Sequence, residues 1–359
     1  YEIADIFRDQ KGKAVIMGGF HPSFMPEEAL RHCDAVCIGE AEPNLKQMIE
    51  DFSHGCLKPR YQNGMADLDS LVPPPRELIP KDKYLWTSPV QATRGCKNQC
   101  TFCSISAFYH NCFRHRPVED VIREIGPLGK NILFLDDNLT TDADFAKELF
   151  ARMIPLKKKW SSQCSVSIAA DKELLDLAQR SGCIGLFIGL ESIEQKNLDA
   201  WQKGDNRAQN YACAIKTLHR KGIGVYAGMV FGNDADDIAC FRHSLDFLLQ
   251  NNVDALQATI LTPFPGTPLY ERMDDQQRIF DNNWAHYDFK HVVFHPKNMS
   301  KVELETGHRK LLKSFYARRR IMKRLLRETA YLPLRTLLLG SLPLNLSYRY
   351  RLISNGVIG

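Results

Sequence analysis

Short apolar runs alternate with amphipathic segments along most of the chain, from residue 88 to about residue 262. Apolar runs of this length predict buried strands, and apolar residues spaced by three or four positions predict helices. The predicted strands are 89–93, 131–136, 163–169, 184–190, 223–231 and 254–261. The predicted helices between them are 117–126, 142–153, 171–181, 194–201, 206–221 and 235–251.

This alternation predicts an α/β fold with a parallel sheet, because parallel strands need crossover connections and helices usually supply them. A closed barrel of this type has eight strand–helix units, whereas the sequence shows six. We therefore predict a partial (β/α)6 TIM-type barrel over residues 88–265.

Residues 1–56 show a second, shorter α/β pattern, with a strand, a helix and a strand over 13–17, 26–32 and 35–38. Two strands are too few for an independent sheet, which predicts a truncated domain. The chain starts with Tyr1-Glu2-Ile3, which is neither an initiator Met nor a signal peptide. We expect the chain to begin inside a longer protein.

Two further segments flank the predicted barrel. Residues 57–87 lack periodicity and are rich in proline, which predicts an extended linker. Residues 266–359 form a C-terminal extension, predicted to be helical over 267–280, irregular and aromatic over 281–299, and a long basic helix over 300–330.

The composition is that of a globular chain: 44% of the 359 residues are apolar and 25% are charged. No apolar stretch reaches the roughly 18–20 residues that span a bilayer. A chain of this length buries a large core without cross-links, so its 11 cysteines are not needed as disulfides. An odd number of cysteines, several of them in one run, predicts a reducing compartment and metal chemistry. The expected location is cytoplasmic, with peripheral attachment at the inner membrane face as an extension of that expectation.

Three cysteines carry the strongest chemical signal. Cys96, Cys100 and Cys103 have a C-x3-C-x2-C spacing and directly follow the first predicted barrel strand. Three thiolates can each bind one iron of a [4Fe–4S] cluster, which leaves the fourth iron open for a substrate. The alternatives are a structural zinc site, with His110, Cys112 or His115 as the fourth ligand, and three unrelated buried cysteines.

The spacing, with aromatic Phe102 before the last cysteine, resembles the signature of the radical S-adenosylmethionine (radical SAM) superfamily, and the resemblance covers residues 88–265. It implies that the open iron binds the amino and carboxylate groups of S-adenosylmethionine. A one-electron donor such as flavodoxin or ferredoxin would then allow reductive cleavage to a 5′-deoxyadenosyl radical.

The resemblance also implies contacts with S-adenosylmethionine, mostly at strand ends. The predicted contact residues are Phe102, Asp136, Asp137, Gln163, Ser165, Glu191 and Gly228. Each aspartate could instead belong to an Asx turn, and Gly228 could instead serve close packing. No residue is assigned a catalytic role.

Residues 1–56 resemble the second half of a cobalamin-binding Rossmann-like domain. The resemblance rests on Gly18 and Gly19 after one strand and on Glu40 after the next, and it implies that these residues approach cobalamin in the full-length protein. His21 is interpreted as a loop histidine without a ligand role. The aromatic segment 263–294 resembles the extension of the cobalamin-binding group that includes hopanoid methylases.

The resemblance therefore implies a cobalamin-dependent C-methyltransferase that acts on a hydrophobic small molecule or lipid. An oxidative cyclase or rearrangement enzyme of the same group is one alternative. A non-catalytic zinc module is another, from a different class. Methylthiotransferases are disfavoured, because they carry a β-rich RNA-binding domain where this chain has a basic helix.

The C-terminal extension concentrates positive charge. Residues 301–359 contain 13 Lys and Arg against 3 Asp and Glu, although the whole chain has a net charge of only +5. Basic and apolar residues alternate at helical spacing over 309–327, which is typical of helices that bind anionic membranes. The alternative is a helix that caps the bottom of the barrel. Nucleic acid is not expected as a partner, because no aromatic platform accompanies the charge.

Overall fold

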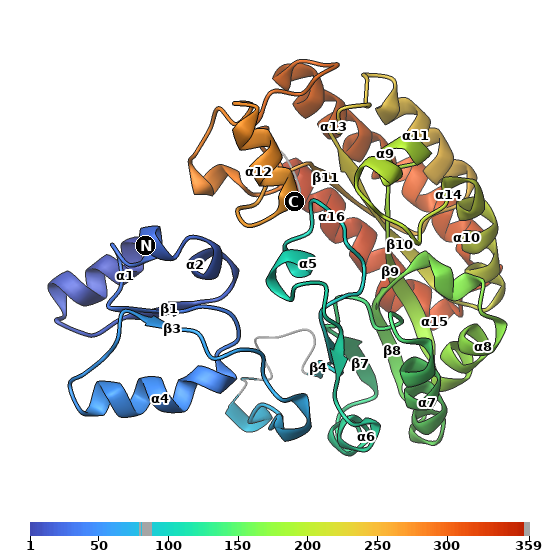
Figure 1. The fold of residues 1–359 in the computed structure, drawn as a ribbon. Helices are drawn as coiled ribbons and strands as arrows, with labels where there is room; N and C mark the ends of the chain where they lie inside the picture. The colour runs from blue at the N-terminus through green and yellow to red at the C-terminus, as the bar shows by residue number, and fades with distance from the viewer. Residues whose placement is uncertain (79, 81–87, 355–359) are drawn as a thin grey trace.

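The computed structural model describes residues 1–78, 80 and 88–354 (Figure 1). Its main sheet has six parallel strands in the order β11-β10-β9-β8-β7-β4. These strands are β4 (Pro89–Val90), β7 (Asn131–Phe134), β8 (Lys159–Cys164), β9 (Cys183–Glu191), β10 (Gly224–Phe231) and β11 (Ala255–Ile260). The predicted partial (β/α)6 barrel is confirmed.

The crossover helices cover the outer side of the strand arc (Figure 1). They are α6 (Val118–Ile125), α7 (Ala143–Met153), α8 (Lys172–Ser181), α9 (Gln195–Ala200), α10 (Tyr211–Arg220) and α11 (Cys240–Gln250). Local signals set their ends: the Asp171 carboxylate accepts a hydrogen bond from the Leu174 amide, and Gly182 ends α8 with φ +101°.

The two faces of the barrel strands differ in burial. Side chains that face the helices, such as Trp160 and Ile188, lie fully inside the core. On the other face, the strand register sets Gln163 beside Phe187 and Phe187 beside Tyr226, and these three side chains are exposed or half-buried. The concave side of the sheet is therefore an accessible lumen, while the convex side is core.

The third predicted strand was misplaced. Residues 163–169 were expected to be extended, but β8 ends at Cys164 and a 3-10 turn, η6 (Val166–Ala169), follows. β8 reads KWSSQC, with polar residues facing the lumen, so it lacks the continuous apolar run of a strand buried on both faces. Val166 and Ile168 are buried from the turn instead.

The N-terminal unit is a separate three-stranded parallel sheet, β1 (Ile16–Gly18), β2 (Ala35–Cys37) and β3 (Arg60–Tyr61). β3 lies in the segment predicted to be an extended linker, so this part of the prediction was wrong. Residues 79 and 81–87 of that linker lie outside the described residues. The helices of this unit are α1 (Glu2–Asp5), η1 (Ile6–Gln10), α2 (Phe20–Phe24), α3 (Pro26–Ala29) and α4 (Glu42–Ser53).

Short elements surround the barrel. The predicted strand 89–93 is divided between β4 and β5 (Thr93–Arg94), and β5 pairs antiparallel with β6 (Arg114–His115). The remaining short elements are η2 (Leu68–Ser70), η3 (Arg76–Leu78), α5 (Ser104–Phe108), η5 (Ile154–Leu156), η7 (Ala208–Asn210) and η8 (Trp284–His286).

The C-terminal extension closes the edge of the sheet. It contains α12 (Pro268–Asp275), α13 (Lys301–Phe315), α14 (Arg318–Glu328), α15 (Leu334–Thr336), η9 (Leu337–Ser341) and α16 (Leu342–Ser354). The single helix predicted over 300–330 is thus broken after Phe315. At the break, the Tyr316 hydroxyl accepts a hydrogen bond from the Leu256 amide (3.0 Å) and donates one to the Leu256 carbonyl (2.7 Å). One side chain thereby satisfies two backbone groups on the edge strand β11.

Within the described part of the chain, no helix is long and apolar enough to cross a membrane.

We expect Tyr316→Phe to lower the free energy of unfolding by about 1–3 kcal/mol, because it leaves two backbone groups on β11 without a partner. Tyr316 is fully buried, so water does not replace the lost hydroxyl. Urea unfolding followed by circular dichroism measures the change, with Tyr270→Phe, at a half-buried tyrosine of α12, as the matched control. Equal unfolding midpoints for the two variants would contradict this stabilising role of the Tyr316 hydroxyl.

Candidate functional site at the carboxyl ends of the strands

The three predicted ligands lie on one loop, residues 95–103, called the cysteine loop below. It follows β5 and precedes α5, at the carboxyl end of β4. Cys100 is buried, and Cys96 and Cys103 are half-buried. Burial raises the pKa of the Cys100 thiol to about 12, and the negative charges of Cys103 and Cys96 act in the same direction. Metal binding is what would stabilise the thiolates of these cysteines.

The donor set fits an iron–sulfur cluster. In such a cluster each thiolate binds a different iron, so the three sulfur atoms need not converge on one point. In the described ranges, no three His, Cys, Asp or Glu side chains form a group that would hold a single metal ion.

Two carboxylates at the end of β7 hold the cysteine loop in place. The Asp136 carboxylate accepts hydrogen bonds from the Ala92 amide (3.1 Å) and from both the amide and the hydroxyl of Thr93. The Asp137 carboxylate accepts one from the Gly95 amide (2.9 Å). Gly95 has φ +82°, and a Cβ there would overlap the Cys112 carbonyl oxygen, so the loop requires glycine at this position.

Asp136 is only 3% exposed, and its second carboxylate oxygen has no hydrogen-bond partner among the described residues. Burial raises the pKa of its carboxyl to about 7. The hydrogen bonds of both aspartates explain their position after the strand, and a contact with S-adenosylmethionine stays a prediction for each.

Two polar side chains next to Cys96 were missed in the sequence. The Asn138 amide nitrogen and the Thr141 hydroxyl each lie 3.8 Å from the Cys96 sulfur, close enough to donate to it. The Asn138 side-chain oxygen also accepts a hydrogen bond from the Ser165 amide (3.0 Å), which links the ends of β7 and β8. Asn138 directly follows the two aspartates, so its position at a strand end was the available signal.

Glu191 ends β9 in an unusual backbone conformation. Its φ is +64°, and the pairing of β9 with β10 shifts register beside it. Asn206 donates a hydrogen bond to the Gly189 carbonyl (2.9 Å), and Tyr211 donates one to the Leu190 carbonyl (2.8 Å). Strained non-glycine residues of this kind cluster at functional sites.

The partner of Glu191 is a residue that sequence reasoning missed. Lys203 Nζ lies 3.0 Å from Glu191 Oε1, and both side chains are largely buried. Burial disfavours the ammonium, yet the charges of Glu191 and Cys100 outweigh it and raise the pKa of Lys203. No spacing links Lys203 to the cysteine loop, so the sequence offers no signal for this contact.

The lumen below the loop brings together other predicted residues. Register sets Gln163 beside Phe187 on β8 and β9, and Gly228 beside Gly189 on β9 and β10. A Cβ at Gly228 would come within 2.8 Å of the Phe187 ring, so this position has little room for a side chain. Ser165 lies just beyond the end of β8. Phe102 does not enter this group, because its ring packs edge-on against Trp201 at 5.2 Å.

Tyrosines form the far end of the lumen. The Tyr226 hydroxyl donates a hydrogen bond to Gln257 Oε1 (3.1 Å) and also contacts the Tyr348 hydroxyl on α16. Tyr348 stacks on Tyr316 at 5.3 Å. The C-terminal helix therefore contributes to the same surface as the strands.

The N-terminal unit docks beside the cysteine loop. Phe20 of α2 contacts Phe108 of α5 at 4.4 Å between ring centroids, and Trp284 Nε1 donates to Glu28 Oε1 (2.7 Å). Gly18 and Gly19 immediately precede α2, and a Cβ on Gly19 would meet no atom within 4 Å. Because Phe20 directly follows Gly19, this glycine pair lies next to the contact between the two units.

Glu40 has a different environment from the one expected for a cofactor contact. Its carboxylate pairs with Arg94 (2.6 Å) and Arg114 (2.9 Å) of the β5–β6 hairpin and accepts a hydrogen bond from the Ala66 amide (2.7 Å). Burial opposes ionisation, but the two arginines outweigh it and lower the pKa of Glu40. These contacts give Glu40 a role in docking the two units, and its contact with cobalamin stays a prediction.

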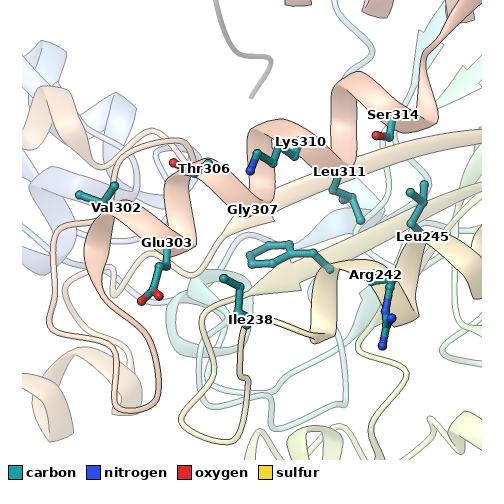
Figure 2. A pocket seen from close by; sticks show the side chains of 11 residues that line it. Ile238, Arg242, Leu245, Val302, Glu303, Thr306, Gly307, Lys310, Leu311 and Ser314 are labelled. Atoms are coloured by element: carbon teal, nitrogen blue, oxygen red, sulfur yellow. The ribbon is translucent and has the colours of Figure 1, made fainter.

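A groove of about 430 Å³ lies elsewhere, between α11 and α13 on the outer helix layer (Figure 2). It is lined mainly by apolar side chains such as Ile238, Leu245 and Val302, with Arg242 and Lys310 among them. None of the predicted site residues lines it.

Comparison with known proteins agrees with this geometry. The radical SAM superfamily model matches residues 90–248. Bacteriochlorophyllide d C-12(1)-methyltransferase of Chlorobaculum tepidum is 34% identical over 337 residues, which are 90% of this chain and 73% of that protein. Hopanoid C-2 methylase of Rhodopseudomonas palustris is 26% identical over 77% of this chain and 55% of that protein.

Among solved structures, the radical S-adenosylmethionine methyltransferase TsrM from Kitasatospora setae, with cobalamin and a [4Fe–4S] cluster bound, has a TM-score of 0.65. It is 17% identical over 77% of this chain, and this chain covers 62% of it, less than two thirds. The fold and the site are those of an enzyme with a barrel of the radical SAM type. The chain belongs to the radical SAM superfamily, with methyltransferases among its relatives.

Proposed function

We propose that this chain binds a [4Fe–4S] cluster through Cys96, Cys100 and Cys103, binds S-adenosylmethionine beside it, and methylates a carbon atom of a hydrophobic small molecule or lipid. The observation that carries the proposal is the cysteine loop at the carboxyl ends of the strands, where barrel enzymes place their active sites. The strained Glu191 and the buried Lys203 lie on the same side.

The cluster, when bound, would accept one electron from a donor such as flavodoxin or ferredoxin for the reductive cleavage of S-adenosylmethionine. The chain's own residues hold and orient the reactants. Asp136 and Asp137 fix the loop backbone, Glu191 offers a carboxylate at the mouth of the lumen, and Gly228 lets the Phe187 ring lie close against β10.

The lining of the lumen supports a hydrophobic substrate. Leu135 follows β7 and is 56% exposed, and Phe187 and Tyr226 are half-buried on the concave face. Gln163 and Gln257 add neutral hydrogen-bonding groups and no charge. The names of the relatives fit this chemistry, since a bacteriochlorophyllide and a hopanoid both have large apolar surfaces.

Cobalamin is the proposed methyl carrier in the full-length protein. The N-terminal unit places the Gly18–Gly19 turn next to the barrel contact, and Gly19 leaves space at its Cα. The solved TsrM structure, which shares the fold, holds cobalamin together with its cluster.

The C-terminal helices support a proposed contact with anionic membranes, but through only some of the apolar residues of 309–327. Phe315 and Ile321 are buried in the core, so this side of the predicted helix caps the barrel. The outer side of α14 instead exposes Met322 (54%) and Leu326 (69%) among its basic residues. Exposed apolar side chains among cations are typical of interfacial helices.

We expect each of Cys96→Ala, Cys100→Ala and Cys103→Ala to abolish the cluster formed by anaerobic reconstitution with iron and sulfide, because each removes one of three thiolates. Cys183→Ala and Cys213→Ala, at a buried and an exposed cysteine outside the loop, serve as controls. Iron content and visible absorbance are the measurements. Unchanged values in all three loop variants would refute the ligand assignment.

Glu191→Ala should weaken binding of S-adenosylmethionine about 10- to 150-fold, because a charge-assisted hydrogen bond contributes on the order of 1.5–3 kcal/mol. Equilibrium dialysis with labelled S-adenosylmethionine measures the affinity of the reconstituted protein. Asp199→Ala, at an exposed carboxylate on α9, is the matched control. Wild-type affinity in the Glu191 variant would remove this residue from the site.

Attachment to vesicles that contain phosphatidylglycerol should be reversible and salt-sensitive, with each basic residue near the surface contributing about 1 kcal/mol. The triple change Arg318→Glu, Arg319→Glu and Lys323→Glu, at exposed positions of α14, should release the protein. Sedimentation of the protein with the vesicles measures the fraction that is bound.

The matched control for the vesicle experiment is Lys11→Glu, Lys13→Glu and Lys46→Glu, at exposed positions of the N-terminal unit, which alters the net charge equally. If the wild-type protein stays in the supernatant at low salt, or if both triple variants are released alike, α14 is not a membrane contact.

A further inference from the structure

Lys203 is a buried cation beside the cysteine loop. Its side chain is 17% exposed, and its ammonium lies 3.0 Å from Glu191 Oε1. This ammonium is held two residues after Trp201, whose backbone is hydrogen-bonded to the cysteine loop.

The position of Lys203 does not depend on Glu191 alone. The Trp201 carbonyl accepts a hydrogen bond from the Thr101 amide of the cysteine loop (3.1 Å), and the Trp201 ring packs against Phe102. The Lys203 amide donates to the Leu198 carbonyl (2.9 Å), which ties the residue to α9. The backbone around Lys203 is thus attached directly to the loop that carries the cysteines.

A charge in this position acts on a bound cluster through simple electrostatics. Reduction adds one negative charge, which a nearby cation stabilises and a nearby anion destabilises. Burial strengthens the interaction, because less water screens it. The net charge around a cluster is one of the factors that set its reduction potential.

We propose that Lys203 raises the reduction potential of the iron–sulfur cluster and that Glu191 opposes it, so that the pair sets how readily the cluster accepts its electron. This inference rests on the proposed function, because it requires the cluster. It assigns Lys203 as a positioning and tuning residue, not as a ligand. If Lys203 served only as the structural partner of Glu191, its removal would leave the potential unchanged.

The experiment is a redox titration of the reconstituted protein followed by electron paramagnetic resonance, without S-adenosylmethionine. Lys203→Met should shift the midpoint potential to a more negative value, Glu191→Gln should shift it to a more positive value, and Lys203→Arg should stay near wild type. The double variant Lys203→Met, Glu191→Gln should lie between the two single variants. Opposite shifts from two neighbouring residues are not expected from general damage to the site.

The matched control is Lys221→Met, since Lys221 is also an ion-paired lysine but pairs with Asp176 of α8. Its midpoint potential should equal that of the wild-type protein. If Lys203→Met retains iron but keeps the wild-type potential, the inference is overturned and the proposed function stands. If Lys203→Met does not retain iron, the Glu191→Gln variant decides, and an unshifted or more negative midpoint overturns the inference.

Absence of a reducible cluster from the wild-type protein would overturn the proposed function, and this inference with it.

Discussion

The geometry of the site depends on the hydrogen bonds from the backbone after β4 to the two carboxylates after β7. β4 is only Pro89–Val90, so the sheet itself holds little of the chain that leads to the cysteines. The Asp136 carboxylate accepts hydrogen bonds from the amides of Ala92 and Thr93, and the Asp137 carboxylate accepts one from the amide of Gly95. A buried carboxylate is costly unless it is hydrogen-bonded, and here the loop backbone supplies the donors. Loop and carboxylates therefore stabilise each other.

A second set of contacts holds the opposite wall. Tyr211 and Asn206 secure the strained turn that ends β9, and the segment from Trp201 to Lys203 docks on the cysteine loop. The same short stretch of chain therefore holds Glu191 in its left-handed conformation and brings an ammonium to its carboxylate, next to the cysteine loop. Because both walls join the cysteine loop through hydrogen bonds, the thiols and the charged pair are fixed relative to one another.

Local signals in the sequence predicted most of the barrel. The helix caps at Asp171 and Gly182 and the apolar runs of β9 and β10 are short-range features, and the structure has these elements where they were expected. The third strand was predicted too late in the chain for a physical reason. Ser161 and Gln163 of β8 face an open lumen, so this strand lacks the apolar run that predicts a buried strand. The break at Tyr316 depends on its contact with the edge of β11, which no helical pattern reveals.

Contacts between distant residues account for what the sequence could not predict. Glu40 pairs with Arg94 and Arg114, and Lys203 pairs with Glu191, only after separate elements have folded together. The position of Glu191 at a strand end and of Gly228 within a strand could be predicted from the alternation alone, whereas their neighbours could not. The three cysteines could be predicted as candidate ligands from their spacing and from the strand that precedes them.

Formation of 5′-deoxyadenosine tests the central claim most directly. The reconstituted protein is incubated anaerobically with S-adenosylmethionine and dithionite, and the products are quantified by liquid chromatography and mass spectrometry. The account predicts 5′-deoxyadenosine from the wild-type protein and none from the Cys100→Ala variant. An intact, reduced wild-type cluster that leaves S-adenosylmethionine uncleaved would contradict it.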